Sequence, residues 1–209
     1  MNGHYSQFPE FTFDWFYNAA AEKDFADIIE KCADRMPQLA ALKKHNQCAA
    51  HHPEGITPFD HTMAALRDYK ENDLVVKLSL LFHDIGKPIV AKKSKNGDYY
   101  NFKEHDKAGV SVFNTLPFTG WIYETIKFAI SNHMRFFKIT DMKVSEVVAL
   151  VENPYNFEVL SKVAYHDIHC RGELSNSNKL FEPNFKRAME IMEEQCPSSY
   201  FQYKRRSEN

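Results

Sequence analysis

An imidazole and a carboxylate stand side by side at His83-Asp84, directly after an apolar run that begins at Leu74. Both groups are good ligands for divalent metal ions of intermediate hardness, and adjacent ligands can approach one ion from two directions. Gly86 and Pro88 follow, so the pair also fits a helix end, with Gly86 in a left-handed cap and Pro88 stopping the helix. Taken alone, the pair is more typical of a helix end than of a metal site.

Other ligand-type side chains recur at intervals of 22 to 34 residues, and the full set is His61, His83, Asp84, His105, His133 and Asp167. Several fall on the apolar stripe of an expected helix: His133 shares a face with Ile126 and Ile130, and Asp167 shares one with Val163. A buried polar group without a partner is costly, and a buried carboxylate is rarely found without a cation or many hydrogen bonds. A metal ion would satisfy the whole set.

The elements that must position these side chains show mostly the helical period. We expect helices over 60–69, 73–85, 105–116, 121–133, 141–152, 157–169 and 184–195, and an amphipathic helix over 25–36 that Pro37 interrupts. Asp60 is the expected N-cap of the 60–69 helix. Between 89 and 102 the helical period fails, and Lys95-Asn-Gly-Asp98 predicts the turn of a β-hairpin flanked by 89–91 and 99–102. The prediction is an all-α fold with one small hairpin near residues 89–102.

Two further segments have the composition of surface chain. Residues 172–183 are rich in serine and asparagine and are expected to form a loop. Residues 200–206 combine aromatic and basic side chains, which could contact RNA, but a solvated tail is the favoured interpretation. His4, His45 and His51 have no periodic context and are expected at the surface.

Composition limits the class of protein. A chain of 209 residues that is 44% hydrophobic and 26% charged fits one soluble globular domain. The net charge of −2 gives no general attraction to nucleic acid, so any polyanion site must be local. No membrane span or secretory signal is visible, so we expect a cytoplasmic protein without a membrane partner. Four cysteines, none in a Cys-x-x-Cys pair, are expected to be reduced and argue against a zinc knuckle: Cys32, Cys48, Cys170 and Cys196.

The combination of His61, His83-Asp-Ile-Gly-Lys-Pro88 and Asp167 resembles the HD superfamily of metal-dependent phosphohydrolases. That resemblance implies an all-helical core around a metal site. It also implies a single HD domain over residues 1–209, with a core at about 50–172. On this division, residues 1–49 form an N-terminal helical extension and residues 173–209 form a C-terminal helix and basic tail.

A closer likeness rests on His52-Pro-Glu-Gly55, Phe59-Asp-His-Thr62 and Phe102-Lys-Glu-His105. Together with the His83 motif they are similar to the HD domain of bacterial CCA-adding tRNA nucleotidyltransferases. Those domains have metal-dependent phosphatase, 2'-nucleotidase and 2',3'-cyclic phosphodiesterase activities. The nucleotidyltransferase head of that family has no counterpart upstream of residue 50, so we expect a hydrolase domain that stands alone.

The resemblance implies a set of metal ligands. His61, His83, Asp84 and Asp167 would bind a first ion. His105 and His133 would bind a second ion, with Asp84 bridging the two. Imidazoles and carboxylates without thiolates suit manganese, iron, cobalt, nickel or zinc better than calcium. The sequence determines neither which of these ions binds nor whether one or two ions bind.

Basic residues follow several of these proposed ligands. Lys87 could contact a phosphate oxygen as a point charge, and with Asp84 it forms the predicted catalytic pair. Arg135 and Arg171 are candidate phosphate clamps or ordinary surface arginines. Glu104 and Asp106 flank His105 and either orient it or face solvent. His166 lies next to Asp167 but on another face of its helix, and we expect no equivalent role for it.

The leading functional prediction is a phosphohydrolase that acts on phosphate monoesters or diesters of a nucleotide, or on an RNA end. A metal ion would lower the pKa of bound water and neutralise the oxygens of the phosphate. An alternative is a mixed-valent di-iron oxygenase of the HD fold that acts on a polyol or a phosphonate. A third is a non-catalytic nucleotide-binding module, whose expected sign would be a missing ligand, and none is missing in this sequence.

Overall fold

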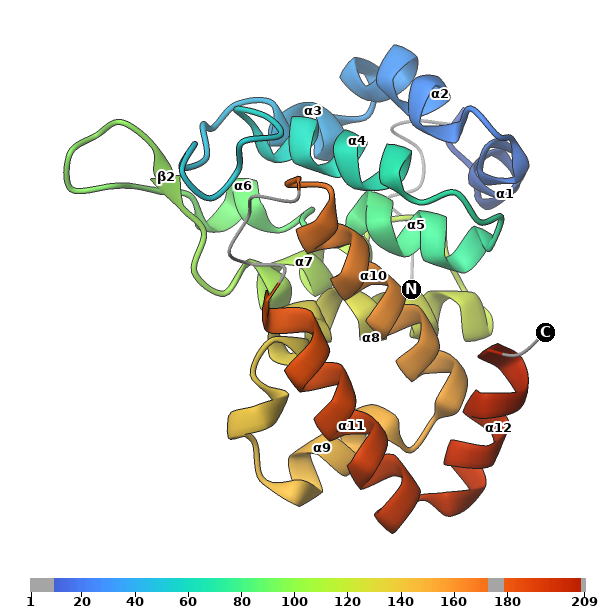
Figure 1. The fold of residues 1–209 in the computed structure, drawn as a ribbon. Helices are drawn as coiled ribbons and strands as arrows, with labels where there is room; N and C mark the ends of the chain where they lie inside the picture. Colours follow the sequence, from blue (N-terminus) through green and yellow to red (C-terminus); the bar gives the residue numbers. More distant parts are fainter. Residues whose placement is uncertain (1–9, 173–178, 208–209) are drawn as a thin grey trace.

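The computed structural model describes residues 10–172 and 179–207, and helices dominate this part of the chain (Figure 1). The α-helices are α1 (Phe13–Ala21), α2 (Phe25–Cys32), α3 (Pro37–Leu42), α4 (Pro58–Asp68), α5 (Leu74–Phe82), α6 (Lys87–Val90), α7 (His105–Phe113), α8 (Gly120–Phe136), α9 (Val144–Val151), α10 (Pro154–His169), α11 (Phe181–Gln195) and α12 (Pro197–Ser207). Short 3₁₀ helices lie at η2 (Ala33–Arg35) and η3 (Ile139–Asp141). The predicted all-α class is confirmed.

Helix α5 is the buried centre of the molecule. Every residue from Val75 to Phe82 is buried, and α5 packs against α1, α4, α8 and α10. Asp73 is its N-cap and accepts hydrogen bonds from the backbone N–H groups of Val75 and Val76. A helix that is apolar nearly all round must be enclosed by others, so the predicted central helix is confirmed. Its C-terminal end delivers His83 and Asp84 into the interior.

Helices α8 and α10, which lie side by side (Figure 1), both contribute side chains to two apolar cores. One core unites α5 and the start of α8 with the N-terminal helices, through side chains such as Phe16, Ile29 and Leu39. The other unites the end of α8 with α9, α11 and α12 around Phe136 and Phe157. Among the described residues, no helix combines the length and the hydrophobicity that a membrane span requires.

Two predicted helix boundaries are wrong. The N-cap of α4 is Thr57, and Asp60 instead completes a capping box from the N3 position by accepting a hydrogen bond from the Thr57 N–H. Gly86 has a φ of −83°, so it does not form a left-handed cap. Pro88 does not end a helix either, because it lies in the first turn of α6, where its missing N–H costs nothing.

Gly86 is required for close packing rather than for backbone freedom. A Cβ at this position would collide with the main-chain oxygen of His105 and the main-chain nitrogen of Gly109. The turn between α5 and α6 therefore rests directly on the backbone of α7, and this approach brings Asp84 next to His105. Since main-chain atoms cannot swing aside as a side chain can, a larger residue would separate these two elements.

Replacing Gly86 with alanine is expected to lower the free energy of unfolding by about 2–3 kcal/mol, because the methyl group overpacks a backbone contact. Urea denaturation of both proteins measures this change. Gly97 is the matched control, since it has a φ of +80° and open space around it. Gly97→Ala should therefore cost only about 1 kcal/mol, from backbone conformation. An equal cost at both positions would contradict the packing argument.

The predicted β-hairpin is present but shorter than expected. Strand β1 (Lys92–Lys93) pairs with β2 (Tyr100–Asn101) in antiparallel register, at the left of Figure 1. Residues 89–91 were predicted as one arm, but α6 extends to Val90 because Pro88 starts a helical turn there. The backbone N–H of Tyr100 donates to Asn46 O, which ties the hairpin to the loop before α4.

The C-terminal segment is a packed helix, so the predicted solvated tail is wrong. Within α12, Tyr203 is buried against the second core. Arg206 donates to Glu158 across 2.6 Å and lies over the Tyr155 ring. The predicted loop at 172–183 is also too long, because α11 begins at Phe181; residues 173–178 and His4 lie outside the described residues.

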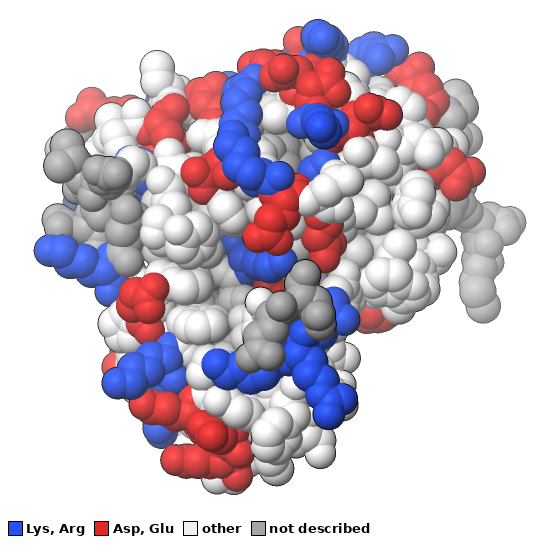
Figure 2. Space-filling view, turned by 45° about the vertical axis from the view of Figure 1, so that its right-hand side comes forward, with Lys and Arg blue, Asp and Glu red and all other residues white. Residues whose placement is uncertain are grey.

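Charges of both signs are interspersed on the face shown in Figure 2. Ion pairs of the described residues include Arg67 with Asp27 at 3.0 Å and Lys162 with Glu71 at 2.6 Å. A surface that alternates in sign produces little net field at a distance. This face therefore offers no general attraction for a polyanion.

Candidate metal centre

The structure brings all six predicted ligand residues into one buried cluster. They come from four helices and the turn after α5, and the residues are His61 (α4), His83 and Asp84 (after α5), His105 (α7), His133 (α8) and Asp167 (α10). Each exposes 7% of its surface or less. Residues up to 106 positions apart in the sequence are therefore in contact, as in the 2.9 Å approach of His61 Nε2 and Asp167 Oδ1.

The Asp84 carboxylate divides the histidines into two pairs. Its Oδ2 lies 3.3 Å from His83 Nε2 and 3.8 Å from His61 Nε2. Its Oδ1 lies 3.1 Å from His105 Nε2 and 3.9 Å from His133 Nε2. Each oxygen thus forms a three-atom group with one pair of imidazoles, and all atoms within a group lie within 4.8 Å of one another.

Main-chain carbonyls fix the orientation of three of these imidazoles. The Nδ1 atoms of His83, His105 and His133 lie 2.7 to 2.8 Å from the carbonyl oxygen three residues upstream. A carbonyl oxygen only accepts hydrogen bonds, so each Nδ1 carries the proton. In a neutral imidazole the other nitrogen then has a free lone pair. Three Nε2 lone pairs are therefore directed at the cluster.

When His105 and His133 are neutral, their Nε2 lone pairs face one another without a proton to share, whereas His61 Nε2 also faces the Asp167 carboxylate. His105 Nε2 and His133 Nε2 are 3.0 Å apart, and His61 Nε2 and His83 Nε2 are 3.4 Å apart. Asp84 Oδ2 is buried and receives no hydrogen bond of acceptable geometry, and its observed cationic partner is the Lys87 ammonium at 2.6 Å. Opposed imidazole lone pairs beside a buried carboxylate are costly in a protein interior, and a metal ion among them would offset that cost. The donor set therefore fits divalent ions.

Electrostatics favours the metal-binding protonation states of His133 and Asp84, whereas at His83 burial acts to lower the pKa but the Asp84 carboxylate outweighs it and raises that pKa. Burial and, to a lesser extent, the neighbouring His105 and His83 together lower the pKa of His133 to about 3. Burial acts to raise the pKa of Asp84, but His83 and Lys87 outweigh it and hold that pKa well below its ordinary value. A neutral imidazole and an ionised carboxylate are the forms that bind a metal ion.

Residues 26–196 match the HD domain, which covers most of the chain. The chain belongs to the HD domain family. No curated protein matches it. HD domains form a superfamily of metal-dependent phosphohydrolases, and the buried histidines and aspartates of this HD domain could hold the metal. The closer likeness to the CCA-adding type stays a prediction.

The three basic residues predicted to bind phosphate occupy different positions relative to the cluster of predicted ligands. Lys87 is 5% exposed, and its Nζ lies 2.6 Å from Asp84 Oδ2 and 2.8 Å from Gln47 Oε1. Arg171 donates from Nη2 to Asp167 Oδ1 at 2.6 Å. Arg135 donates to Asn132, one turn back on its own helix. Lys87 and Arg171 thus contact predicted ligands, whereas the observed contact of Arg135 is local.

Sequence analysis missed two side chains at the centre, Glu54 and Gln47. Glu54 Oε1 lies 2.6 Å from His61 Nδ1 and 2.9 Å from His52 Nδ1. Burial acts to raise the pKa of Glu54, but hydrogen bonds from His52 and His61 lower it to about 2. The His52-Pro-Glu-Gly55 motif was a signal for Glu54, because it contributed to the family resemblance. Gln47 had none.

Of the remaining predictions from the sequence, some are confirmed and one is wrong. Glu104 is exposed and pairs with Lys107, so it faces solvent. His166 bonds to Asp68 at 2.6 Å and not to the ligand cluster, as expected. His51 is exposed as expected, but His45 is half-buried against the Tyr100 ring, because the hairpin folds over it. The four cysteines are free.

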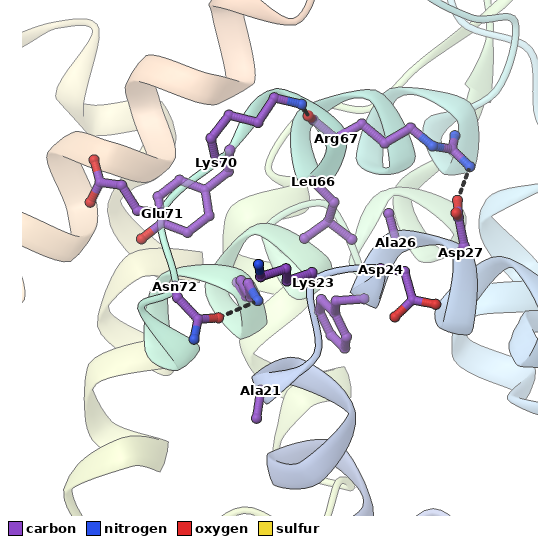
Figure 3. A pocket seen from close by; sticks show the side chains of 13 residues that line it. Ala21, Lys23, Asp24, Ala26, Asp27, Leu66, Arg67, Lys70, Glu71 and Asn72 are labelled. Atoms are coloured by element: carbon purple, nitrogen blue, oxygen red, sulfur yellow. Dashed lines mark hydrogen bonds and ion pairs between the residues drawn. The ribbon is translucent and has the colours of Figure 1, made fainter.

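A separate cavity of about 680 Å³ lies between α2, the end of α4 and the start of α5 (Figure 3). Its walls carry both signs of charge, and Arg67 is paired with Asp27. Lys77 Nζ donates to Ala20 O, Glu22 O and Asn72 Oδ1, so its donors are occupied. The balanced walls favour no ligand of either sign.

Proposed function

We propose that this HD protein hydrolyses phosphate monoesters or diesters of nucleotides or RNA ends, using two divalent ions. The observation that carries the proposal is the Asp84 carboxylate, which faces one histidine pair with each oxygen. A single carboxylate shared between two three-ligand groups suits two closely spaced ions. Bound there, the ions would lower the pKa of a water molecule and neutralise the phosphate oxygens.

The residues of the chain have separate tasks in this proposal. His61, His83 and Asp167 would hold the first ion, His105 and His133 the second, and Asp84 both. Since all six side chains are buried on helices or at a helix end, their geometry is set before substrate arrives. The protein would therefore spend no binding energy on ordering its ligands.

Lys87 is proposed to bind a phosphate oxygen of the substrate. An ammonium has three N–H donors, and its Nζ has Asp84 Oδ2 and Gln47 Oε1 as partners. One donor is left for a phosphate, and once ions neutralise Asp84 the ammonium is held less tightly. Arg171 uses donors on Asp167 and keeps others for a phosphate. Arg135, whose observed contact is with Asn132, is the third candidate.

The proposal is tested with purified protein, loaded in turn with manganese, cobalt or nickel. The substrates are 2',3'-cyclic nucleotides, nucleoside monophosphates and a chromogenic phosphodiester. We expect turnover of at least one class, and strong reduction in Asp84→Asn. No turnover with any metal would overturn the proposal. Oxygen consumption by the iron-loaded protein with a polyol or a phosphonate would instead indicate an HD-fold oxygenase.

Replacing Lys87 with methionine is expected to lower kcat/KM about 10- to 100-fold, because a hydrogen bond to a charged group contributes about 1.5–3 kcal/mol. Metal content should be kept, since removing a neighbouring positive charge does not weaken cation binding. Steady-state kinetics and metal analysis of the same sample measure both effects. Lys107→Met is the control, because Lys107 is exposed and paired with Glu104. Loss of metal in Lys87→Met would contradict this role.

A further inference from the structure

One of the four clustered histidines is oriented differently from the others. His83, His105 and His133 each donate from Nδ1 to a main-chain carbonyl on their own segment. His61 Nδ1 instead lies 2.6 Å from the Glu54 carboxylate, which comes from the loop before α4. His61 is therefore the histidine of this cluster whose orientation depends on a replaceable side chain.

Burial, hydrogen bonds and the closed loop hold Glu54 in its position. Its side chain is 5% exposed, and its Oε1 accepts hydrogen bonds from both His61 and His52. The loop that carries it is closed at its base by the hydrogen bond from Gln47 N–H to Ile56 O. The His52 ring packs edge-on against the His61 ring, with centroids 5.0 Å apart. Glu54 thus has little freedom to leave His61.

The His52, Glu54 and His61 group is compact enough to suggest a metal site of its own. The distances from Glu54 Oε1 to the two Nδ1 atoms, 2.9 and 2.6 Å, are those of direct hydrogen bonds. A metal ligand role for His61 Nδ1 would also require both ring nitrogens to lose their protons, because Nε2 already faces His83 and Asp167. The group is better explained as a hydrogen-bonded support.

We propose that Glu54 is a positioning residue, which keeps the proton of His61 on Nδ1 and directs the Nε2 lone pair at the first ion. A carboxylate behind a ligating histidine fixes its tautomer and raises its basicity, and losing such a partner typically weakens metal affinity about 10- to 100-fold. The inference rests on the proposed metal site, but not on the reaction or the substrate. If the proposal holds, loss of Glu54 weakens binding of the first ion and leaves binding of the second unchanged. The reason is that the His105 and His133 pair has no link to Glu54.

The test is Glu54→Gln in the full chain, with manganese binding measured by titration in the absence of substrate. We expect affinity for the first ion to fall about 10- to 100-fold and affinity for the second to stay unchanged. Glu104→Gln is the matched control, because Glu104 adjoins the ligand His105 but pairs with exposed Lys107. Unchanged first-ion affinity, or equal losses at both sites, would overturn the inference.

A second measurement does not depend on ions. Histidine nitrogen NMR of the metal-free protein should show His61 protonated at Nδ1, and a mixture of tautomers in Glu54→Gln. A third variant, His52→Ala, leaves Glu54 to His61 alone, so first-ion affinity should be kept. A loss as large as that of Glu54→Gln would show that the group only supports the loop. Because no substrate is used, these results are independent of whether the protein hydrolyses phosphoesters.

Discussion

Replacing Asp84 with asparagine is expected to remove both ions and to lower phosphoester hydrolysis about a thousandfold, which corresponds to about 4 kcal/mol of transition-state stabilisation. The Asp84 carboxylate serves one histidine pair with each oxygen. An amide has one oxygen and no charge, so it cannot serve both pairs. Metal analysis after dialysis, together with turnover of the best substrate, measures the effect.

The control for this variant is Asp98→Asn. Asp98 is an exposed aspartate in the hairpin turn, and the same chemical change there should leave metal content and turnover unaltered. Asp84→Asn also removes the charge next to Lys87, so thermal unfolding must confirm that the variant is folded. A folded Asp84→Asn protein that keeps both ions would show that Asp84 does not bridge them.

Replacing His133 with glutamine is expected to remove the second ion and to leave the first. His133 Nε2 faces His105 and the Oδ1 side of Asp84, whereas the first group uses Oδ2. We expect activity to fall about 100-fold, since one ion would no longer neutralise the phosphate. Metal stoichiometry measured by titration distinguishes this variant from Asp84→Asn, which should lose both ions.

His166→Gln is the matched control for His133→Gln. His166 is half-buried on α10 and bonds to Asp68, so this variant removes an imidazole outside the cluster. Its metal stoichiometry should equal that of the unaltered protein. A His133→Gln protein that binds two ions, or none, would contradict the division of the site into two groups.

The helical framework of the site was predictable from periodicity. Helix α5 is apolar on nearly every position, and such a segment has to be enclosed whatever surrounds it. His133 and Asp167 could be placed inside because they share a face with apolar residues on long helices. Burial of these two residues followed from the stripes, and the common location of all six proposed ligands followed from the family resemblance.

Contacts made by irregular backbone were not predictable in the same way. Gly86 fitted a helix cap, but it allows the close approach of the turn before α6 to α7, which is a property of two elements together. Glu54 lies in a loop, and loop conformation depends on distant hydrogen bonds such as that between Gln47 and Ile56. The segment with Tyr203 and Arg206 was predicted as a solvated tail because the residues that hold it, such as Glu158 of α10, are distant in the sequence.

Anomalous diffraction from crystals grown with manganese tests the two-ion centre most directly. We expect two peaks, one bounded by His61, His83 and Asp84, and the other by Asp84, His105 and His133. No peak next to Asp84, or a single peak enclosed by His52, Glu54 and His61, would contradict the account.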